Sequence, residues 1–455
     1  MSKVIIGSNN YLRINLSVFI FLFMILILNT SKFAKSQEIW SLTKCINYAL
    51  ENNIDLNIMN NEVSKQKITF LESKAKLLPD LNLGSVINSN FGRNIDGSTN
   101  NITYNQTITN NYWINSSVNI FQGLVKQNTI RYNKLLLSAT NEEAMVVKNK
   151  LYMSVITAYY TAIYCTEIKN VALNQVNLSE MQYNRMQKLV DIGKEYPISS
   201  QDFKSQWASD KLSLTLAENN MNKYLLELKQ LLRINAIQDF KIDTLNIANI
   251  EINCLENIDS IYKVAVNVLP EIKRQEYLLS ASKKELAVAK GGVLPQIYLS
   301  AGIYTNYFDG DKLAYANQLT NNQNQQINMG IVIPIFNQAS VYSNIKRNQI
   351  AVSDRKYEIE NQKNNLYTEI LKAVDELHSA ENEYKSSAEL LEYSELTFQN
   401  ITKKIETGLA STTDYEVAKQ RFMTAKVALL KAKLLYVMHK QILEFYKTGN
   451  WNHLI

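Results

Sequence analysis

The sequence predicts a mainly α-helical protein with a small β part, built from two copies of one structural repeat. Residues 124–192 and residues 339–407 each form a run of 69 residues without Gly or Pro. Mostly apolar and small residues follow a 4-3 spacing in both runs, at positions 215 residues apart, with Lys169 out of character in the first run. A spacing that averages 3.5 residues is typical of a left-handed coiled coil, and the shared spacing indicates an internal duplication. The seam positions of the second run are Leu366, Ile370, Ala373, Leu377, Ala380, Tyr384, Ser387, Leu391, Ser394, Phe398, Ile401 and Ile405.

Residues 1–36 have the pattern of a secretory signal peptide. Lys3 and Arg13 precede an apolar core of residues 16–28, and residues 34–36 offer a small-x-small cleavage site. The core is shorter than the roughly 20 residues of a membrane-spanning helix, which favours cleavage over the alternative of a membrane anchor. No cysteine lies at this cleavage site, so we expect no lipid anchor. The segment carries four basic and no acidic residues, so it accounts for most of the formal net charge of +6.

The first repeat is predicted to span residues 37–234, and residues 235–257 are predicted to connect it to the second. It opens with a short helix from Ser41 and a second helix that Pro79 ends. Two alternating segments on either side of an Asn- and Thr-rich loop are predicted strands. The expected elements are helices at 41–50 and 56–77, strands at about 81–91 and 113–121, the long helix 124–192, and a return helix from about Ser199.

The second repeat is predicted to span residues 258–455 and to follow the same plan. Two shorter helices are separated by Leu269-Pro270, and a glycine pair ends the second of them. A polar loop at residues 309–326 separates the two strands. The expected elements are strands at about 296–308 and 327–335, the long helix 339–407, and a return helix with Ala418, Phe422, Ala425, Leu429, Ala432 and Tyr436 on one stripe.

The predicted strands have one apolar and one polar face. Leu83 and Ile87 alternate with asparagines in the first strand, and Ile114 and Val118 do so in the second. Strands of about ten residues are long enough to cross a bilayer when tilted. Four strands cannot close a membrane barrel, which needs at least about eight, so we expect an oligomer that pools its strands. The alternative is the edge of a soluble β-sandwich.

The sequence shows no catalytic, cofactor or metal constellation. His378, His439 and His453 lie far apart, and no phosphate-binding loop or nucleophile motif is present. The odd number of widely spaced cysteines, Cys45, Cys165 and Cys254, favours small buried side chains over a disulfide or a metal site. The sequence has no basic patch with interleaved aromatic residues, the pattern that would indicate nucleic-acid binding. We therefore expect a protein that is not an enzyme and binds no nucleic acid.

Four motifs in the predicted order resemble the TolC-type outer-membrane efflux proteins. They are Ser-Leu-x-x-x-Ile-x-x-Ala-Leu-x-x-Asn at 41–53, Leu-Leu-Pro at 77–79 with Val-Leu-Pro at 293–295, Ile-Pro-Ile-Phe at 333–336, and Thr-Gly-Leu-Ala-Ser-x-x-Asp-Tyr at 407–415. The resemblance covers nearly the whole chain after residue 36. It implies a homotrimer whose 12 pooled strands form a barrel in the outer-membrane lipid, and whose helices form a periplasmic α-helical coiled-coil barrel. It also implies two partners, a periplasmic adaptor and an inner-membrane pump.

The ends of the two long helices are the candidate functional sites. In the resembled family an aspartate six residues after the tip glycine lines the tunnel entrance, and Gly408 and Asp414 reproduce that spacing. Asp202 is the weaker counterpart in the first repeat. A trimer would arrange such residues as carboxylate rings that favour cations, but capping of a helix N-terminus is an equally sufficient role for each aspartate.

Three positions depart from the gate pattern of the family, and three others match its docking tips. Ala410 stands where a basic residue is expected, Ile405 where a tyrosine is expected, and Val417 where a second aspartate is expected. The family docks its adaptor at the positions of Gly193, Gly408 and Leu409, which also suit simple C-caps of the helices.

The hypothesis that follows is a passive outer-membrane exit duct of a tripartite efflux or type I secretion system. The alternative is a secreted or periplasmic coiled-coil scaffold or adhesin without a channel.

Overall fold

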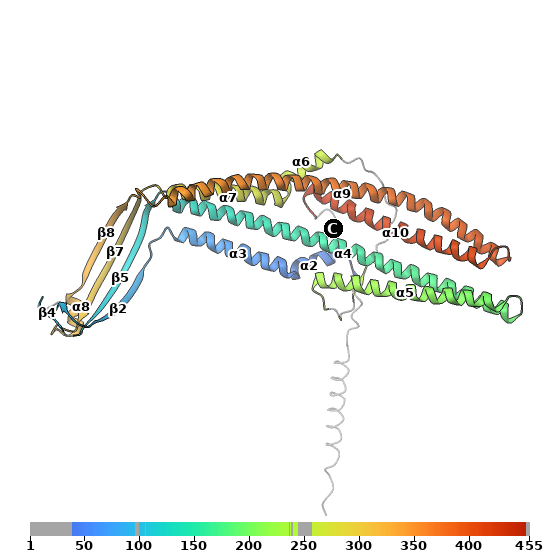
Figure 1. Cartoon of the computed structure of the whole chain (residues 1–455), viewed down its shortest axis with the longest axis horizontal. Helices are drawn as coiled ribbons and strands as arrows, with labels where there is room; N and C mark the ends of the chain where they lie inside the picture. Colours follow the sequence, from blue (N-terminus) through green and yellow to red (C-terminus); the bar gives the residue numbers. More distant parts are fainter. Residues whose placement is uncertain are drawn as a thin grey trace, which may run out of the picture.

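The computed structural model describes residues 39–95, 100–104, 106–235, 237, 240–243 and 257–451. The predicted signal peptide, most of the predicted connector, Cys254 and His453 lie outside the described residues. The described chain is elongated, with a β-sheet at one end and two long helical hairpins that reach the other end (Figure 1).

The two long helices match the prediction to within one residue at each end. They are α4 (Val125–Asp191) and α9 (Ser340–Glu406), each 67 residues and therefore about 100 Å long. Each turns back into a return helix, α5 (Pro197–Leu232) or α10 (Thr412–Thr448). The predicted seam faces the partner helices, since its second-repeat positions are buried or half-buried from Leu366 to Ile405. The coiled-coil interpretation and the duplication are thus confirmed.

Shorter helices complete the two copies of the repeat. Helix α2 (Leu42–Asn52) and α3 (Ile54–Ala75) precede the first sheet strands, and α6 (Ile258–Val268) and α7 (Pro270–Gly291) precede the second pair. Near the middle of the molecule, α2, α6 and the end of α10 pack on α4 and α9 in one apolar core. A short parallel pair, β1 (Ile39–Trp40) with β6 (Lys241–Ile242), lies beside this core, where the hydroxyl of Tyr159 donates to the backbone oxygen of Trp40.

The main sheet has four antiparallel strands in the order β2-β5-β7-β8, so both repeats contribute to it. Its strands are β2 (Asn82–Asn90), β5 (Thr107–Gln122), β7 (Gln296–Phe308) and β8 (Asn324–Val332). A small hairpin, β3 (Asn94–Ile95) with β4 (Ile102–Thr103), and the short helix α8 (Tyr315–Asn321) lie at the far end.

Two sequence predictions about this sheet were wrong in detail. The segments predicted as loops, residues 92–111 and 309–326, contain regular structure, because β5 already begins at Thr107 and α8 forms between β7 and β8. The side chain of Gln318 fixes α8 by accepting from the backbone N–H of Phe308 and donating to the oxygen of Leu313. The last strand lies three residues earlier than predicted. Its pairing ends at Val332 because β7 begins at the partner Gln296 and Pro334 has no N–H to donate.

The observed pairing confirms the two-faced character of the strands. Direct cross-strand partners share a face, so Leu83, Ile114 and Ile303 lie together on one side. On the same side Val118, Leu299 and Met329 form a second apolar row. This face is uncovered, since Leu83 is 79 % exposed and Ile327 is 80 % exposed. The sheet is therefore a single layer within the described chain, and not one half of a sandwich.

A left-handed two-residue turn leads from each repeat's strands into its long helix. In the first copy it is Gly123-Leu124 and in the second Gln338-Ala339, all four with φ between 56° and 60°. Glycine adopts this conformation without strain, whereas a side chain does so at a cost. Gly123 also lies against the backbone of Gly291, where a Cβ would overlap the carbonyl oxygen. Gln338, which is exposed, occupies the position in the second copy that Gly123 occupies in the first, and it carries a side chain there.

Replacing Gln338 by glycine should raise the free energy of unfolding by about 0.5–1 kcal/mol, because it removes the left-handed strain. Thermal unfolding of the detergent-extracted protein measures this. The matched control is Ser340→Gly two residues on, at a right-handed helical position, which should lower stability by about as much. Equal destabilisation by both variants would contradict the strain argument.

Candidate gate at the tips of the helical hairpins

The tip glycines end the long helices as left-handed C-caps. Gly193 has φ 74° and Gly408 has φ 75°, and a Cβ at either would meet nothing within 4 Å. The N–H of Gly408 donates to the oxygen of Ile405, and the N–H of Leu409 donates to the oxygen of Lys404. This pair of bonds is a Schellman motif. Leu409 is 77 % exposed at the tip, so the cap leaves an apolar side chain in solvent.

Asp414 is part of a reciprocal capping box at the start of α10. Its N–H donates to Oγ of the N-cap residue Ser411 over 3.1 Å, and its Oδ2 accepts from the Ser411 N–H over 3.1 Å. The Ser411 hydroxyl donates to the same oxygen over 2.7 Å. The two bonds that Oδ2 accepts stabilise the charged carboxylate, and the hydroxyl bond contributes more than the N–H bond. Together they hold the pKa of Asp414 below its ordinary value. Capping is therefore an established role for this carboxylate, which is also exposed.

The other predicted gate residues are not brought into polar contact with Asp414. Asp202 is exposed in the second turn of α5, whose N-cap is Tyr196, so the capping interpretation of Asp202 was wrong. Ile405 and Ala410 are half-buried beside the tip, and Val417 is 45 % exposed on α10. All three side chains are apolar, so they can form no ion pair or side-chain hydrogen bond that would hold a gate closed.

The Asp414 cap should weaken in acid. Because the folded pKa is depressed, the stabilisation is complete above the ordinary aspartate pKa near 4 and is lost as the pH falls through the depressed pKa. Hydrogen exchange at the first turn of α10 should therefore accelerate below about pH 4 in the wild type. Asp414→Asn should abolish this acid-dependent step, and Asp202→Asn should leave it unchanged. A step that persists in Asp414→Asn would assign the effect to another group.

An aromatic layer joins the two hairpins just above the tips. Tyr415 of α10 is 1 % exposed and contacts Phe203 of α5, with ring centroids 6.5 Å apart, and Phe398 of α9, at 5.5 Å. Phe398 stacks in turn on Phe422 at 5.4 Å. Burial raises the pKa of Tyr415 to about 12, and its hydroxyl hydrogen-bonds to Gln182 of α4. One tyrosine thus contacts all three other helices of the hairpin pair.

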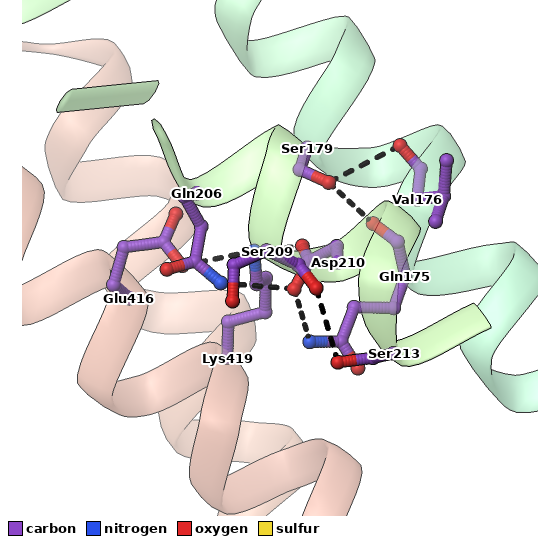
Figure 2. Close-up of polar contacts among 9 residues, drawn as sticks. All are labelled: Gln175, Val176, Ser179, Gln206, Ser209, Asp210, Ser213, Glu416 and Lys419. Carbon is purple, nitrogen blue, oxygen red and sulfur yellow. Dashed lines mark hydrogen bonds and ion pairs between the residues drawn. The ribbon is translucent and has the colours of Figure 1, made fainter. Parts of the chain in front are cut away.

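A buried ionic network lies next to this layer, and Figure 2 shows its members. Nζ of Lys419, 0 % exposed on α10, is 3.2 Å from Oδ2 of Asp210, 2 % exposed on α5. Oδ1 of Asp210 accepts from Nε2 of Gln175 on α4 over 2.8 Å and from Nε2 of Gln206 over 2.9 Å. Nζ of Lys419 also lies 2.8 Å from Oε2 of Glu416. The network joins the first repeat to the second through the interior.

The intact network contributes little to stability, whereas loss of one of its members destabilises the fold strongly. Both charges are removed from water, so the intact pair contributes little net stability against an apolar packing of the same volume. Breaking the pair by removing one partner is different, because an uncompensated buried charge destabilises by about 3–5 kcal/mol. The network therefore specifies how α5 and α10 fit together. A weaker exposed pair, Arg185 of α4 with Glu406 of α9 at 3.6 Å, lies nearer the tip.

This network was not predicted from the sequence, although one signal for it is present there. The apolar stripe of the first return helix reads Phe203, Trp207, Leu214 and Ala217 in 4-3 steps, with Asp210 at the intervening seam position. A charge on a seam needs a buried partner. Lys419 follows directly on Ala418 in the stripe of the other return helix, but only the tertiary structure pairs the two. Within the described residues, no group of three or more His, Cys, Asp or Glu is arranged to hold a metal ion.

Comparison with solved structures shows which known proteins share this fold. The chain matches CusC at 17% identity and a TM-score of 0.77, covering 90% of this chain and 92% of that one. It matches the CmeC outer membrane channel of Campylobacter jejuni at 17% identity and a TM-score of 0.76, covering 90% and 86%. It matches the open state of the MtrE outer membrane channel of Neisseria gonorrhoeae at 16% identity and a TM-score of 0.74, covering 90% of this chain and 89% of that one. The fold is that of outer-membrane channels.

Comparison of the sequence with protein-family models agrees with this fold. Residues 262–445, most of the second repeat, match the family model described as outer membrane efflux protein. The second repeat thus resembles the outer membrane efflux proteins, and the family resemblance seen in the motifs is confirmed. No curated protein gives a significant match to the chain. Among the described residues, no helix combines the length and the apolar character that a membrane crossing requires.

Proposed function

We propose that the chain is one protomer of a passive exit duct through the outer membrane. Three copies close a 12-stranded barrel in the lipid, and their helices continue it as a tunnel across the periplasm. A periplasmic adaptor and an inner-membrane pump deliver and energise the substrate. The duct itself performs no chemistry and needs no cofactor.

The observation that carries this proposal is the uncovered apolar face of the sheet. Leu83, Ile87, Ile327, Met329 and Ile331 are each more than 60% exposed on strands otherwise flanked by polar residues. A soluble protein rarely leaves so large an apolar surface to water, whereas a barrel wall turns such a face to lipid.

The two free edges of the sheet support the trimer. Strands β2 and β8 each pair on one side only within the described chain. Unpaired backbone groups are not tolerated in the hydrocarbon of a bilayer, so the edges must pair with neighbouring copies. Three four-stranded sheets give twelve strands, an even number within the range of closed membrane barrels.

Mass measurement and planar-bilayer recording of the detergent-extracted protein test the duct. A trimer that inserts and conducts supports it. A monomer that stays soluble without detergent and never conducts overturns it in favour of the coiled-coil scaffold.

We propose that Asp414 also forms a carboxylate ring at the tunnel entrance, in addition to its cap. The spacing from Gly408 and the exposure of the carboxylate support this role. Two variants separate the ring from the cap. Asp414→Asn removes the charge and keeps an acceptor for Ser411, whereas Ser411→Gly removes the capping hydroxyl and keeps the charge. Block of the conductance by a divalent cation on the tip side should disappear in Asp414→Asn and persist in Ser411→Gly. Block that survives in Asp414→Asn would leave the cap as the only role.

We propose that the buried network of Asp210 and Lys419 holds the entrance closed, with the Tyr415 aromatic layer beside it. The apolar Ala410, Ile405 and Val417 cannot form the polar links expected at those positions, whereas the network joins the same two hairpins. The exposed tips, Gly193, Gly408 and Leu409, remain available to the adaptor, which docks there in this proposal.

A further inference from the structure

The second face of the sheet is polar, and its strand residues carry no charge; a carboxylate beside it is that of Asp80, just before β2, which accepts from Ser117 at the edge of the face. The strand pairing places every second residue of β2, β5, β7 and β8 on this face, on the side opposite the apolar rows. Twelve of these residues are carboxamides, and none is Asp, Glu, Lys or Arg. The carboxamides are Asn82, Asn88, Asn90, Asn111, Asn115, Asn119, Gln122, Gln296, Asn306, Asn324, Gln326 and Asn328. Along the strands this wall therefore offers an ion no ring of charged side chains.

Three aromatic rings lie flat on this uncharged face. The ring of Trp113 covers Gly84, its partner across β2 and β5, so that a Cβ at Gly84 would overlap the indole. The ring of Tyr298 covers Gly330, its partner across β7 and β8, in the same way.

The third ring belongs to Tyr304, which covers Gly302 on its own strand. Tyr304 is also the cross-strand partner of Trp113. Tyr298 lies six residues further along β7, or about 20 Å at roughly 3.3 Å per residue. The rings therefore present their faces at two levels along the wall.

Flat rings among carboxamides suit one kind of solute. The face of an aromatic ring is the negative side of its quadrupole, so it attracts the polarised C–H groups on the flat side of a sugar ring. Neighbouring Asn side chains offer both donors and acceptors to hydroxyl groups. A neutral solute loses nothing to the missing charges, whereas an ionic one finds no counter-charge. Covering a glycine with a ring also stabilises a strand, which is the purely structural role of such pairs.

From this arrangement we infer that the polar face is a binding wall for neutral saccharide chains, with Trp113, Tyr298 and Tyr304 as stacking platforms. The inference rests on the proposed duct, in which this face lines the lumen because the apolar face meets lipid. A saccharide would then bind weakly and repeatedly along the wall as it passes out. The conducted substrate class is accordingly a neutral glycan or a molecule that carries one.

Bilayer recording with maltohexaose on the barrel side tests the wall in the conducting trimer. The wild type should show brief, concentration-dependent current interruptions that a polyethylene glycol of similar length does not produce. Trp113→Leu combined with Tyr304→Leu should shorten the interruptions roughly tenfold, the equivalent of about 1.4 kcal/mol. The matched control is Tyr112→Leu, one residue from Trp113 on the opposite face, which should leave them unchanged.

A second measurement does not depend on conduction. Saturation-transfer NMR of maltohexaose with the detergent-extracted wild type should show transfer to the sugar-ring protons, and the double variant should lose most of it. Conduction with neither interruptions nor transfer overturns the saccharide wall and leaves the duct intact. Equal transfer in the wild type and the double variant also overturns it. Absence of conduction in the wild type counts against the duct alone.

Discussion

Lys419→Met should open the periplasmic end of the duct and raise its single-channel conductance several-fold. The methionine fills most of the space of the lysine but leaves Asp210, 2 % exposed, without its cation. An uncompensated buried carboxylate destabilises the contact between α5 and α10 by about 3–5 kcal/mol. The two hairpins then separate or admit water to hydrate the charge. Planar-bilayer recording of the purified trimer measures the change.

The double variant Lys419→Met with Asp210→Leu is the decisive control. It removes both charges and leaves an apolar contact, so it should restore the low conductance even though it lacks the ion pair. Lys431→Met is a second control on the same helix, because the pair that Lys431 forms with Glu383 is about half exposed and contributes little. An unchanged conductance in Lys419→Met would show that the network does not hold the entrance.

Met329→Lys should prevent stable assembly in the outer membrane, whereas Asn328→Lys should be tolerated. The two residues are neighbours on β8, but Met329 lies in the apolar row with Leu299, and Asn328 lies on the polar face with Ser300. A lysine on the lipid-facing side of a barrel costs about 2–4 kcal/mol near the bilayer midplane, and three protomers repeat the change. The yield of folded trimer in outer-membrane fractions measures the difference.

The variants Met329→Lys and Asn328→Lys together also test which face of the sheet meets lipid. Intact trimers from both variants would mean that the sheet is not embedded, and the apolar surface would then need another partner. Loss of the trimer in Asn328→Lys alone would mean that the two faces had been exchanged. Because both variants add the same lysine at adjacent positions of one strand, differences in charge or strand propensity do not explain an unequal outcome.

Much of the fold is readable from local pattern. The 4-3 spacing from Leu366 onward and the glycines at 193 and 408 located both long helices to within a residue, because helix periodicity and caps are properties of neighbouring residues. Strand alternation likewise located the two faces of the sheet. Strand ends were less accurate. The end of β8 depends on where its partner β7 begins, which is a tertiary fact that residues 327–335 do not contain.

The candidate gate was only partly predictable. The spacing from Gly408 predicted Asp414 as a gate residue, which stays a prediction, and its capping box is encoded within four residues of sequence. Asp210 and Lys419 are 209 residues apart, and their local contacts with Gln206 and Glu416 do not by themselves bring the two buried charges together. The same holds for Tyr415, whose contacts come from α4, α5 and α9.

The sequence alone determined the duplicated repeat, the long helices, the two-faced strands and the family that they resemble. Only the tertiary structure decided the strand order, the flat rings over Gly84 and Gly330, and the pairing of Asp210 with Lys419. The reason is the range of the interactions. Periodicity, caps and alternation act over a few residues and leave a pattern in the chain, whereas a buried charge finds its partner through the packing of whole helices.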